Sequence, residues 1–598
     1  MAISVSIKKF NGHEYVYIVD GFRDPLTRRP TSRTLVSFGR KDKLLAGDPD
    51  AMKKVEETCQ RLRKDSSAYS DTIKDRLLTG AHVDESAYER PASLTCTPAV
   101  FYPIWKQLGM EAYFNNYRHN HKLAYDLTKT VFFGCVSRLI APSSKSSAWR
   151  HRQSFIIDFD DIELQRLYDC LDILSDHKDK ITTKLNKSID AMYQRDLTIA
   201  MYDVSTFYFE SFTEDDFRRR GMSKEHRTQE TQVVLGLLID SEGIPFAYEL
   251  FPGNTAEVHT LPKVVNKFRK LYKIKDVIVV ADSGLNQLVN LDQLQELNLK
   301  FIVGYPPYVK LSKAKQDELL NEADWNWHTS PCGDEWGHKN LALEIDKKIV
   351  NSATGEKKAE KLSATCIGTF STHRYHHDLN ELNLEWNKAE QLVSKGKEDV
   401  AAASKSGFKA FIKVSTKSAT LNNDLYEKRQ RWCGYGALLT NIKGQKPEWI
   451  YHKLRQLWRI EDNFRMFKTN LQARPVFVWT QEHIRGHFVL NYIALVMQKI
   501  LLRHLNNQGV HISAAELVEA LESMKVNRLQ GMKKANSNLY SCSNTQALST
   551  FMTDADGNPI TLRELCDRIL KACGMEPLNS LESAPSIKRK LKVQLPIQ

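Results

Sequence analysis

The chain has 598 residues, of which 42% are hydrophobic and 26% are charged, and Lys and Arg together outnumber Asp and Glu by 13. This length predicts about three to five domains, and the basic balance favours an anionic partner such as nucleic acid. No apolar run is long enough for a membrane span and the N-terminus lacks a secretory signal, so neither a membrane protein nor a secreted protein is expected. Ten cysteines without any Cys-x-x-Cys pair predict reduced thiols in a cytosolic protein.

The first third of the chain is predicted to hold a small β element followed by helices. Residues 4–40 contain two strand-like segments flanking Asn11 and Gly12, the strongest short hairpin signal, and a third strand-like segment follows. Residues 48–78 are charged and helical. From 97 to 195 apolar residues recur at three- and four-residue spacing, which indicates helices. We interpret this helical region as the part that recognises DNA, and a helical spacer is the alternative.

From about residue 197 the pattern changes from helices to strands. Residues 196–211, 231–240 and 245–253 are typical of three successive antiparallel strands. Segments at 275–285 and 299–306 supply a fourth and a fifth strand, each preceded by a helical stretch. The order βββ-α-β-α-β is that of the ribonuclease H fold, a meander followed by crossover units. We therefore predict an α/β fold with a mixed five-stranded sheet flanked by helices.

The remaining segments predict an insertion and a helical C-terminal part. Residues 310–440 mix Lys-rich stretches with short strands, which indicates a β-rich insertion, and long helices are expected at 447–471 and 480–504. The C-terminal region is predicted to be helical and then polar, ending in the basic tail 588–592. The predicted units are an N-terminal β-hairpin and helical region (1–95), a helical DNA-binding domain (96–195) and the first part of the catalytic core (196–309). The insertion (310–440), the second part of the core with the Glu helix (441–505) and the C-terminal region (506–598) follow.

Two acidic residues lie in or directly after predicted buried strands, where a carboxylate is unfavourable. Asp203 lies near the start of the first strand and Asp282 closes the fourth. A carboxylate costs several kcal/mol to bury without a partner. The first and fourth strands of this fold are neighbours, so the two carboxylates would face each other and would repel unless a cation lay between them. Oxygen ligands in this arrangement suit Mg²⁺ or Mn²⁺.

A third acid is predicted on the helix at 447–471. Glu461 and Lys468 lie two turns apart in a stripe at three- and four-residue spacing from 450 to 471. The other members of this stripe are apolar: Ile450, Leu454, Leu457, Phe464 and Leu471. An ion pair with Arg465 at i+4 is the alternative role for Glu461. Beside two strand-end aspartates, we favour the role of metal ligand.

The chain resembles bacterial insertion-sequence transposases of the DDE class, in the branch of the IS-four superfamily that carries a β-rich insertion between the second Asp and the Glu. The resemblance runs from near residue 10 to about 505 and is carried by segments such as "YDVSTFYFES", "VIVVADSGL" and "LWRIEDNFRMFKTNL". It implies that Asp203, Asp282 and Glu461 are the catalytic triad and that they hold two Mg²⁺ or Mn²⁺ ions.

The resemblance also implies DNA contacts near the triad. The spacing from Glu461 to Lys468 matches the helix pattern of the family, but the Tyr and the first Arg of that pattern would fall at Leu454 and Leu457. Neighbouring residues are candidates to replace them: Tyr451, Arg455, Arg459 and Arg465. Ahead of the second strand, His226 and Arg227 are candidates for a phosphate contact, and a solvated loop is the alternative.

Two further patterns have both a functional and a packing interpretation. His483 and His487 lie one helical turn apart, a spacing that can bind zinc, but the sequence shows no third ligand, so a packing or phosphate-binding role is favoured. In the insertion, Trp325, Trp327 and Trp336 are candidates for stacking on a DNA base, and core packing is favoured for each of them.

The function implied is that of a transposase that cuts phosphodiester bonds at transposon ends and joins the freed 3′-OH to target DNA by two-metal-ion catalysis. The expected partners are the double-stranded DNA of the ends and of the target, and a second copy of the chain in a homodimer. The expected location is the bacterial cytoplasm, at the nucleoid. The alternatives are a non-catalytic DNA-binding protein derived from such a transposase and a ribonuclease H-like nuclease that cuts without joining strands.

Overall fold

The computed structural model describes most of the chain. The described ranges are 2–10, 12–23, 30–64, 93–221, 229–256, 260–261, 264–265, 267–268, 278–282, 291, 294–295, 299–330, 333–343, 345–350, 357–362, 364–395, 407–414, 419–529, 539–541, 552–553 and 559–596. His226 and Arg227 lie outside these ranges. The eight cysteines within them are free thiols, and seven of these are buried.

The N-terminal segment forms a three-stranded antiparallel sheet with its own small core. Its strands are β1 (Ala2–Phe10), β2 (His13–Arg23) and β3 (Pro30–Arg40), and its helices are α1 (Lys41–Gly47) and α2 (Ala51–Lys64). Phe10 pairs with His13, which confirms the predicted two-residue hairpin connection. Val16 and Ile18 of β2 are buried against Val55 and Cys59 of α2.

A large mixed sheet forms the centre of the fold. The predicted strands are present as β5 (Ile199–Tyr208), β6 (Gln232–Ile239), β7 (Pro245–Pro252), β8 (Ile278–Ala281) and β9 (Lys300–Gly304). They lie in the order β7-β6-β5-β8-β9. The first three are antiparallel neighbours, whereas β8 runs parallel to both β5 and β9. The predicted meander and the adjacency of the first and fourth strands are therefore confirmed.

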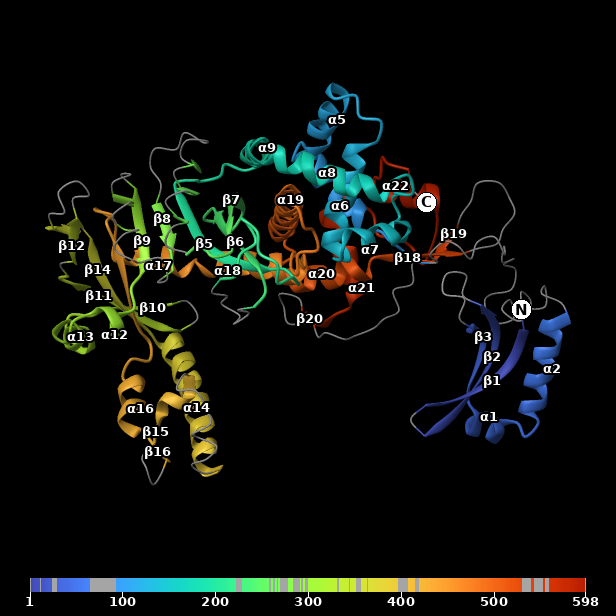
Figure 1. Ribbon diagram of the computed structural model, residues 1–598, viewed down its shortest axis with the longest axis horizontal. Coiled ribbons are helices and arrows are strands. Elements are labelled where there is room, and N and C mark those ends of the chain that lie inside the picture. The colour runs from blue at the N-terminus through green and yellow to red at the C-terminus, as the bar shows by residue number, and fades with distance from the viewer. Residues whose placement is uncertain are drawn as a thin grey trace.

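The prediction of five strands required the sheet to end at β9, but it does not end there. It continues through β17 (Tyr435–Thr440), β14 (Thr365–Ser371), β11 (Glu335–Leu341) and β10 (Asn326–Thr329), which gives nine strands among the described residues. The physical reason is that an edge strand presents unpaired N–H and C=O groups, and β17 pairs with those of β9. The insertion thus extends the sheet instead of interrupting it (Figure 1).

The insertion also contains helices and two hairpins that lie outside this sheet. Its helices are α12 (Pro307–Lys310), α13 (Lys313–Leu320), α14 (Thr372–Lys395), the 3-10 helix η5 (Gly407–Phe411) and α16 (Asn423–Gln430). Two hairpins join β12 (Ile345–Val350) to β13 (Lys357–Leu362) and β15 (Ile412–Val414) to β16 (Ala419–Leu421).

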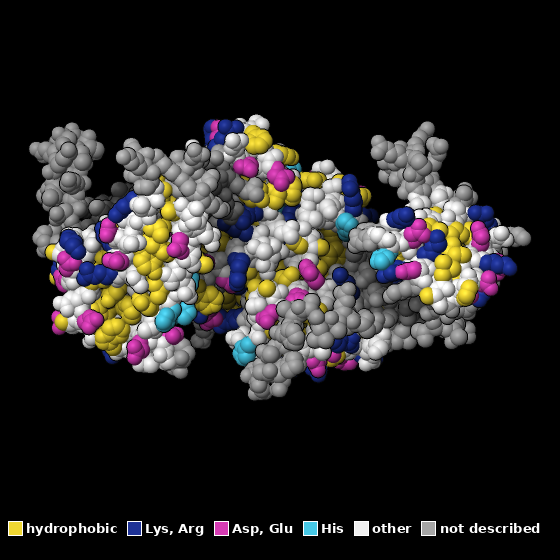
Figure 2. Space-filling view, turned by 90° about the horizontal axis from the view of Figure 1, so that it is seen from below, with side chains coloured by type: hydrophobic (Ala, Val, Ile, Leu, Met, Phe, Trp, Pro, Cys, Tyr) yellow, Lys and Arg dark blue, Asp and Glu magenta, His cyan; other side chains and the backbone are white. Residues whose placement is uncertain are grey.

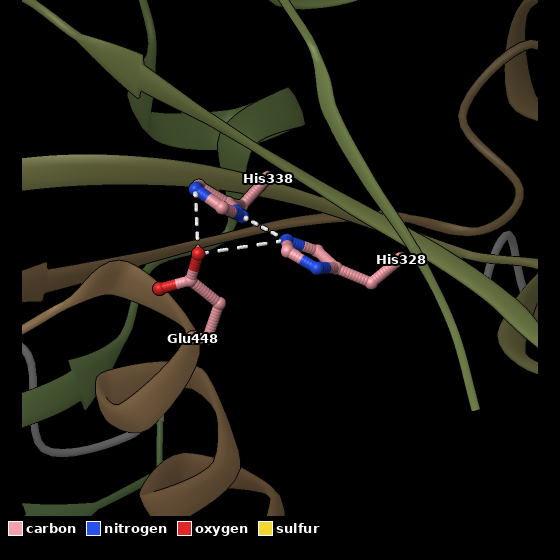
Figure 3. Close-up of side chains that lie close together, drawn as sticks. All are labelled: His328, His338 and Glu448. Carbon is pink, nitrogen blue, oxygen red and sulfur yellow. Dashed lines mark hydrogen bonds and ion pairs between the residues drawn. The ribbon is translucent and has the colours of Figure 1, made fainter. Parts of the chain in front are cut away.

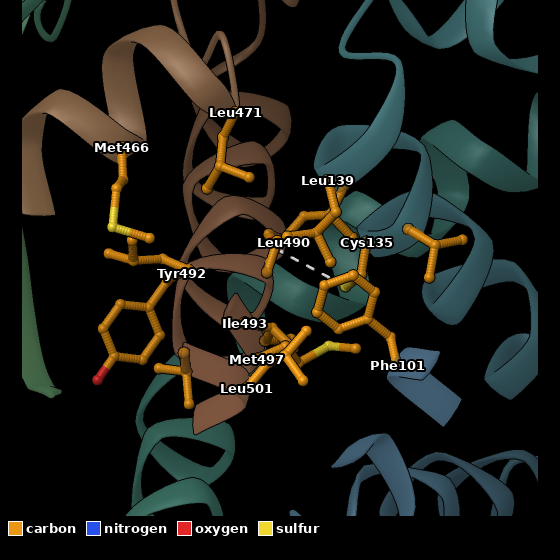
Figure 4. Packing of buried hydrophobic residues seen from close by; sticks show 14 of the residues in the cluster. Phe101, Cys135, Leu139, Met466, Leu471, Leu490, Tyr492, Ile493, Met497 and Leu501 are labelled. Atoms are coloured by element: carbon orange, nitrogen blue, oxygen red, sulfur yellow. Dashed lines mark hydrogen bonds between the residues drawn. The ribbon is translucent and has the colours of Figure 1, made fainter. Parts of the chain in front are cut away.

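The helices expected at 97–195 are present, and several of them pack on one long helix from the C-terminal half. They are α4 (Thr97–Gln107), α5 (Met110–Asn120), α6 (Leu127–Ile140), α7 (Lys145–Arg150), the 3-10 helix η2 (Arg152–Ser154), α8 (Leu164–Asp176) and α9 (Lys178–Met192), and the long helix is α19 (Gln481–Asn507). Figure 4 shows Leu490 and Ile493 of α19 packed near Phe101 and Leu139, while Tyr492 points the other way. Tyr492 reaches the sheet, where its ring lies 4.8 Å from that of Tyr248 on β7. The helices and the sheet therefore share one continuous core.

The long helix α19 has the length and hydropathy of a membrane-spanning segment. Its most apolar 18-residue window has a mean hydropathy of 1.3, and 78% of that window is buried inside the molecule. A core helix of a globular protein is buried to a similar extent. Here the buried residues of α19 contact α4, α6, α8 and the sheet.

The C-terminal region is not only helical, which corrects the prediction. It contains α20 (Ala514–Ser523), α21 (Leu562–Ala572) and α22 (Ala584–Lys590), but also the hairpin β20 (Met552–Thr553) and β21 (Pro559–Ile560) and three strands of a separate four-stranded sheet. The order of that sheet is β22-β19-β18-β4, from β22 (Leu581–Ser583), β19 (Leu539–Ser541), β18 (Lys525–Leu529) and β4 (Ser93–Thr95). The predicted basic tail falls mostly in α22, where Ile587 and Leu591 are buried and Lys590 pairs with Glu582.

Candidate active site

The two predicted aspartates lie next to each other at one edge of the central strands. In the parallel ladder of β5 and β8, Tyr202 pairs with Ala281. One position further along the same register places Asp203 opposite Asp282, which is the first residue after β8. The fold thereby brings together two carboxylates that are 79 positions apart in the chain.

Alternation along the strands points both aspartates to the same face of the sheet. Met201 and Val280 belong to the core between the sheet and α19, whereas Tyr202 and Ala281 belong to the core on the opposite face. Successive side chains of a strand point to opposite faces, so Asp203 shares the face of Met201, and Asp282 shares that of Val280.

The predicted helix at 447–471 is broken into three parts, which corrects the single-helix prediction. These are α17 (Pro447–Arg455), α18 (Trp458–Arg465) and the π-helical turn η6 (Met466–Asn470), and the break lies at Gln456 and Leu457. In α18, Ile460 and Phe464 are buried in the core on the same face of the sheet as the aspartates, and Glu461 is exposed. The fold therefore places all three predicted acids on one side of the sheet.

Asp282 and Glu461 line the same cleft, which has a volume of about 290 Å³. Tyr451 and Arg455 of α17 line it as well, and Arg455 Nη1 donates a hydrogen bond of 3.2 Å to the Tyr451 hydroxyl. Asp203 does not reach the wall of this cleft, and its Oδ1 accepts a hydrogen bond of 2.7 Å from the Val204 N–H. Among the described residues, the three acids do not form a group whose oxygens all lie within 4.8 Å of one another.

Arg459, Arg465 and Lys468, the other predicted DNA-contacting residues that the structure describes, do not line this cleft. Arg459 donates to the Ser241 carbonyl at the turn after β6, and burial lowers its pKa although Asp240 lies nearby. Arg465 pairs with Asp462, so the alternative ion pair of Arg465 with Glu461 is wrong. Lys468 lies in η6 with its Nζ 5.9 Å from the centre of the Phe207 ring.

The acid next to Glu461 has a structural role. Asp462 Oδ2 accepts a hydrogen bond of 2.8 Å from Lys499 of α19. Burial on its own would raise the pKa of Asp462, but Lys499 and Arg465 outweigh it and hold that pKa below its usual value. Asp462 therefore fastens α18 to α19, and Glu461 is the acid that α18 presents to the cleft.

Sequence reasoning did not select Arg374, Tyr305 or Thr369, which also line the cleft. Arg374 stands in the first turn of α14, and its side chain is 57% exposed while its Nε donates to Asp378 at 3.3 Å. The sequence signal that could have pointed to Arg374 is the run "STHRYHHD", which is rich in basic and imidazole groups. On the face shown in Figure 2, Lys and Arg are dispersed among Asp and Glu and do not form one large basic patch.

The two histidines at helical spacing do not share a ligand. His483 Nε2 lies 3.4 Å from Asp172, whereas His487 is buried and contacts the Ala473 carbonyl at 3.2 Å. Burial lowers the pKa of His487 well below its usual value. Packing therefore accounts for His487, whereas His483 contacts the Asp172 carboxylate.

Comparison with known proteins gives one family match and several distant structural similarities. Residues 194–497, just over half of the chain, match the family described as the transposase DDE domain. No curated protein matches the chain in sequence. The chain is similar to the piggyBac transposase in the cryo-EM structure of its synaptic complex with hairpin DNA, at 9% identity over 74% of this chain and 82% of that one, with a TM-score of 0.31.

It is also similar to the Mos1 transposase in its paired-end complex with the left transposon end, at 12% identity over 29% of this chain and 57% of that one, with a TM-score of 0.14. The chain is also similar to the crystal structure of a pre-cleavage Mos1 transpososome, at 11% identity over 42% of this chain and 75% of that one, with a TM-score of 0.13. At these TM-scores the structural similarities support no argument about fold or function.

Proposed function

The chain belongs to the transposase DDE domain family, and from that premise we propose that it is a DNA transposase with Asp203, Asp282 and Glu461 as its catalytic acids. Strands β7-β6-β5-β8-β9 would then be its ribonuclease H-like core. The observation that carries the proposal is the meeting of Asp203 and Asp282 across the β5–β8 ladder, with Asp282 and Glu461 in one cleft.

The three acids fit divalent cations by the chemistry of their donor atoms. All three offer carboxylate oxygens, which Mg²⁺ and Mn²⁺ prefer. Two aspartates brought to one strand edge repel each other when both are ionised, and a cation bound there would remove that cost. When bound, two such ions would activate the attacking hydroxyl and stabilise the charge on the oxygen that leaves phosphorus.

The residues of the cleft would orient the DNA for two successive reactions. In the first, a water oxygen bonds to the phosphorus at the transposon end, loses its proton, and the 3′ oxygen leaves as a hydroxyl. In the second, that 3′-OH attacks a phosphodiester of the target, and the target's own 3′ oxygen leaves. Arg374 and Arg455 would hold the phosphates through charge-assisted hydrogen bonds, without reading sequence.

The proposed partners are the DNA of two transposon ends and of the target. Because two ends have to be brought together for insertion, we propose that the chain acts as a homodimer on DNA, with helices α4–α9 taking part in recognition of the ends. Its proposed location is the bacterial cytoplasm at the nucleoid.

The test is cleavage of candidate end DNA by the full chain with Mg²⁺. We expect Asp282→Asn to slow cutting by at least about a hundredfold, because a ligand to the charge-stabilising ions is lost, while DNA binding persists. The control is Asp196→Asn, an exposed aspartate just before the start of the same strand β5. Equal cutting by the parent and Asp282→Asn would overturn the assignment.

The same substrates separate the alternative functions. A marked 3′ end that becomes joined to a target plasmid is the result expected for a transposase. Cutting without joined product would identify a nuclease, and DNA binding without cutting by the parent chain would identify a non-catalytic protein.

A further inference from the structure

Two histidines and a glutamate meet outside the proposed active site, at the outer edge of the nine-stranded sheet. His328 lies on β10, His338 on β11 and Glu448 in the first turn of α17, and Figure 3 shows all three side chains pointing toward one another. One ligand atom from each lies within 4.8 Å of the others. His328 Nε2 is 3.3 Å from His338 Nδ1 and 3.6 Å from Glu448 Oε1, and His338 Nε2 is 4.0 Å from the same oxygen.

The sheet register creates this arrangement. His328 pairs with Trp336 across the β10–β11 ladder, and His338 lies two residues beyond Trp336, so both imidazoles stand on the same face. The His328 ring stacks on the Trp336 indole at 4.4 Å, which fixes its orientation. The His338 side chain is only 4% exposed, so the strands hold both rings in place before any ligand arrives.

The two imidazoles are within hydrogen-bond distance of each other, but neither is hydrogen-bonded to Glu448. Separations of 3.6 and 4.0 Å from the imidazole nitrogens to Glu448 Oε1 are too long for hydrogen bonds. In a tetrahedral site with metal–nitrogen distances of about 2.0–2.1 Å, the ligand atoms lie about 3.3 Å apart. The observed 3.3 Å separation uses His338 Nδ1 and the 4.0 Å separation uses His338 Nε2, and an ion would bind only one of these nitrogens. One ligand atom from each residue lies within 4.8 Å of the others, so an inward movement of the side chains would close them on an ion.

The second oxygen of Glu448 points to the same conclusion. Glu448 Oε2 is buried and, within the described part of the chain, accepts no hydrogen bond. A buried carboxylate oxygen without a donor is costly, and a bound cation would compensate the charge of the whole carboxylate.

We propose that His328, His338 and Glu448 bind a divalent transition-metal ion of the zinc class, separately from the carboxylate site for Mg²⁺. Two imidazoles and one carboxylate are a ligand set that suits Zn²⁺, Co²⁺ or Ni²⁺, whereas Mg²⁺ prefers oxygen ligands alone. Three protein ligands leave the fourth position of a tetrahedral ion to water.

The ion would fasten the outer hairpin β10–β11 to α17. That helix also carries Tyr451, whose ring stacks on the other side of Trp336 at 4.5 Å and lines the cleft of Asp282 and Glu461. His328, Trp336 and Tyr451 therefore form a continuous stack from the proposed ion to the wall of the cleft. The site is in a position to set where α17 lies relative to the insertion, whichever reaction the cleft performs.

The experiment is titration of the full chain with Zn²⁺ by calorimetry, in excess Mg²⁺ to occupy the carboxylates. We expect one Zn²⁺ per chain, and at least about tenfold weaker binding by His328→Ala and by Glu448→Gln. His328 is chosen because it is 32% exposed and Glu448→Gln because it preserves shape, so both variants should fold, as circular dichroism would check. Zn²⁺ should also raise the melting temperature of the parent but not that of His328→Ala.

Two controls separate this site from others. His452→Ala removes an exposed imidazole of the same helix that also contacts Trp336, and Asp282→Asn alters the proposed active site; both should bind Zn²⁺ as the parent does. Absence of Zn²⁺ binding by the parent, or equal binding by His328→Ala and Glu448→Gln, would overturn the proposal. Loss of the Zn²⁺ site in Asp282→Asn would instead place the ion in the catalytic cleft and would also overturn it.

Discussion

Asp240 shows how a single buried carboxyl shapes the stability of this protein. It follows β6, its Oδ1 accepts hydrogen bonds of 2.9 Å from the N–H groups of Glu242 and Ile244, and its side chain is fully buried. Burial raises its pKa to about 6, although Arg195 and Arg503 lie near and oppose the shift. The folded state therefore binds a proton between about pH 4 and 6 that the unfolded state does not bind, so this stabilising contribution is lost as the pH rises through 6.

We predict that the parent loses about 1 kcal/mol of unfolding free energy between pH 5 and 7.5 relative to Asp240→Asn, which cannot ionise. Urea unfolding at the two pH values measures this difference. The control is Asp190→Asn, which removes the other carboxylate paired with Arg195, one that is 45% exposed. The same pH dependence in Asp240→Asn and the parent would show that Asp240 does not titrate in this range.

At the scale of elements, the close approach of α8 and α19 depends on one glycine. A Cβ at Gly486 of α19 would lie 2.0 Å from the backbone oxygen of Leu171 on α8, and that backbone has little room to move. A Cβ at Gly134 of α6 would lie 3.0 Å from a methyl group of Leu490, a side chain that can change rotamer. Since both glycines are helical, alanine gains similar helix propensity at each.

We therefore predict that Gly486→Ala lowers the unfolding free energy by about 3 kcal/mol, whereas Gly134→Ala changes it by less than about 1 kcal/mol. Chemical unfolding of the two variants beside the parent gives the comparison. An unchanged unfolding free energy for Gly486→Ala would mean that α8 and α19 can separate without cost.

At the scale of the whole molecule, the shared core predicts which segments fold alone. Helices α4, α6 and α8 bury apolar residues against α19, which begins about 300 positions after the end of α8. Residues 93–195 expressed alone should therefore lack cooperative unfolding and be cleaved quickly by protease. Residues 1–64 have their own core and serve as the comparison. This fragment expressed alone is expected to retain the circular dichroism signal of β-strands. Cooperative unfolding of 93–195 would show that the predicted boundary at 195 separates independent domains. The domain boundaries otherwise remain predictions.

The sequence alone predicted most of the local elements of the central sheet and selected the acids of the proposed site. Apolar β-branched runs predicted β5, β6, β7, β8 and β9 and their order, because strand propensity and crossover rules act over short stretches. Asp203 and Asp282 were selected because they lie in or directly after such runs, where an acid is unfavourable without a cation.

Only the tertiary structure decided the features that depend on pairing between distant segments. Neither the pairing of β17 with β9 nor the His328–His338–Glu448 group leaves a spacing signal, because each depends on which edges and faces meet in space. The break at Gln456 and Leu457 is likewise invisible in a periodic pattern that continues across it, and it changes which residues of 447–471 share a face with Glu461. Local propensity has a range of a few residues, whereas burial and strand pairing act between segments tens or hundreds of positions apart, and these set which side chains meet.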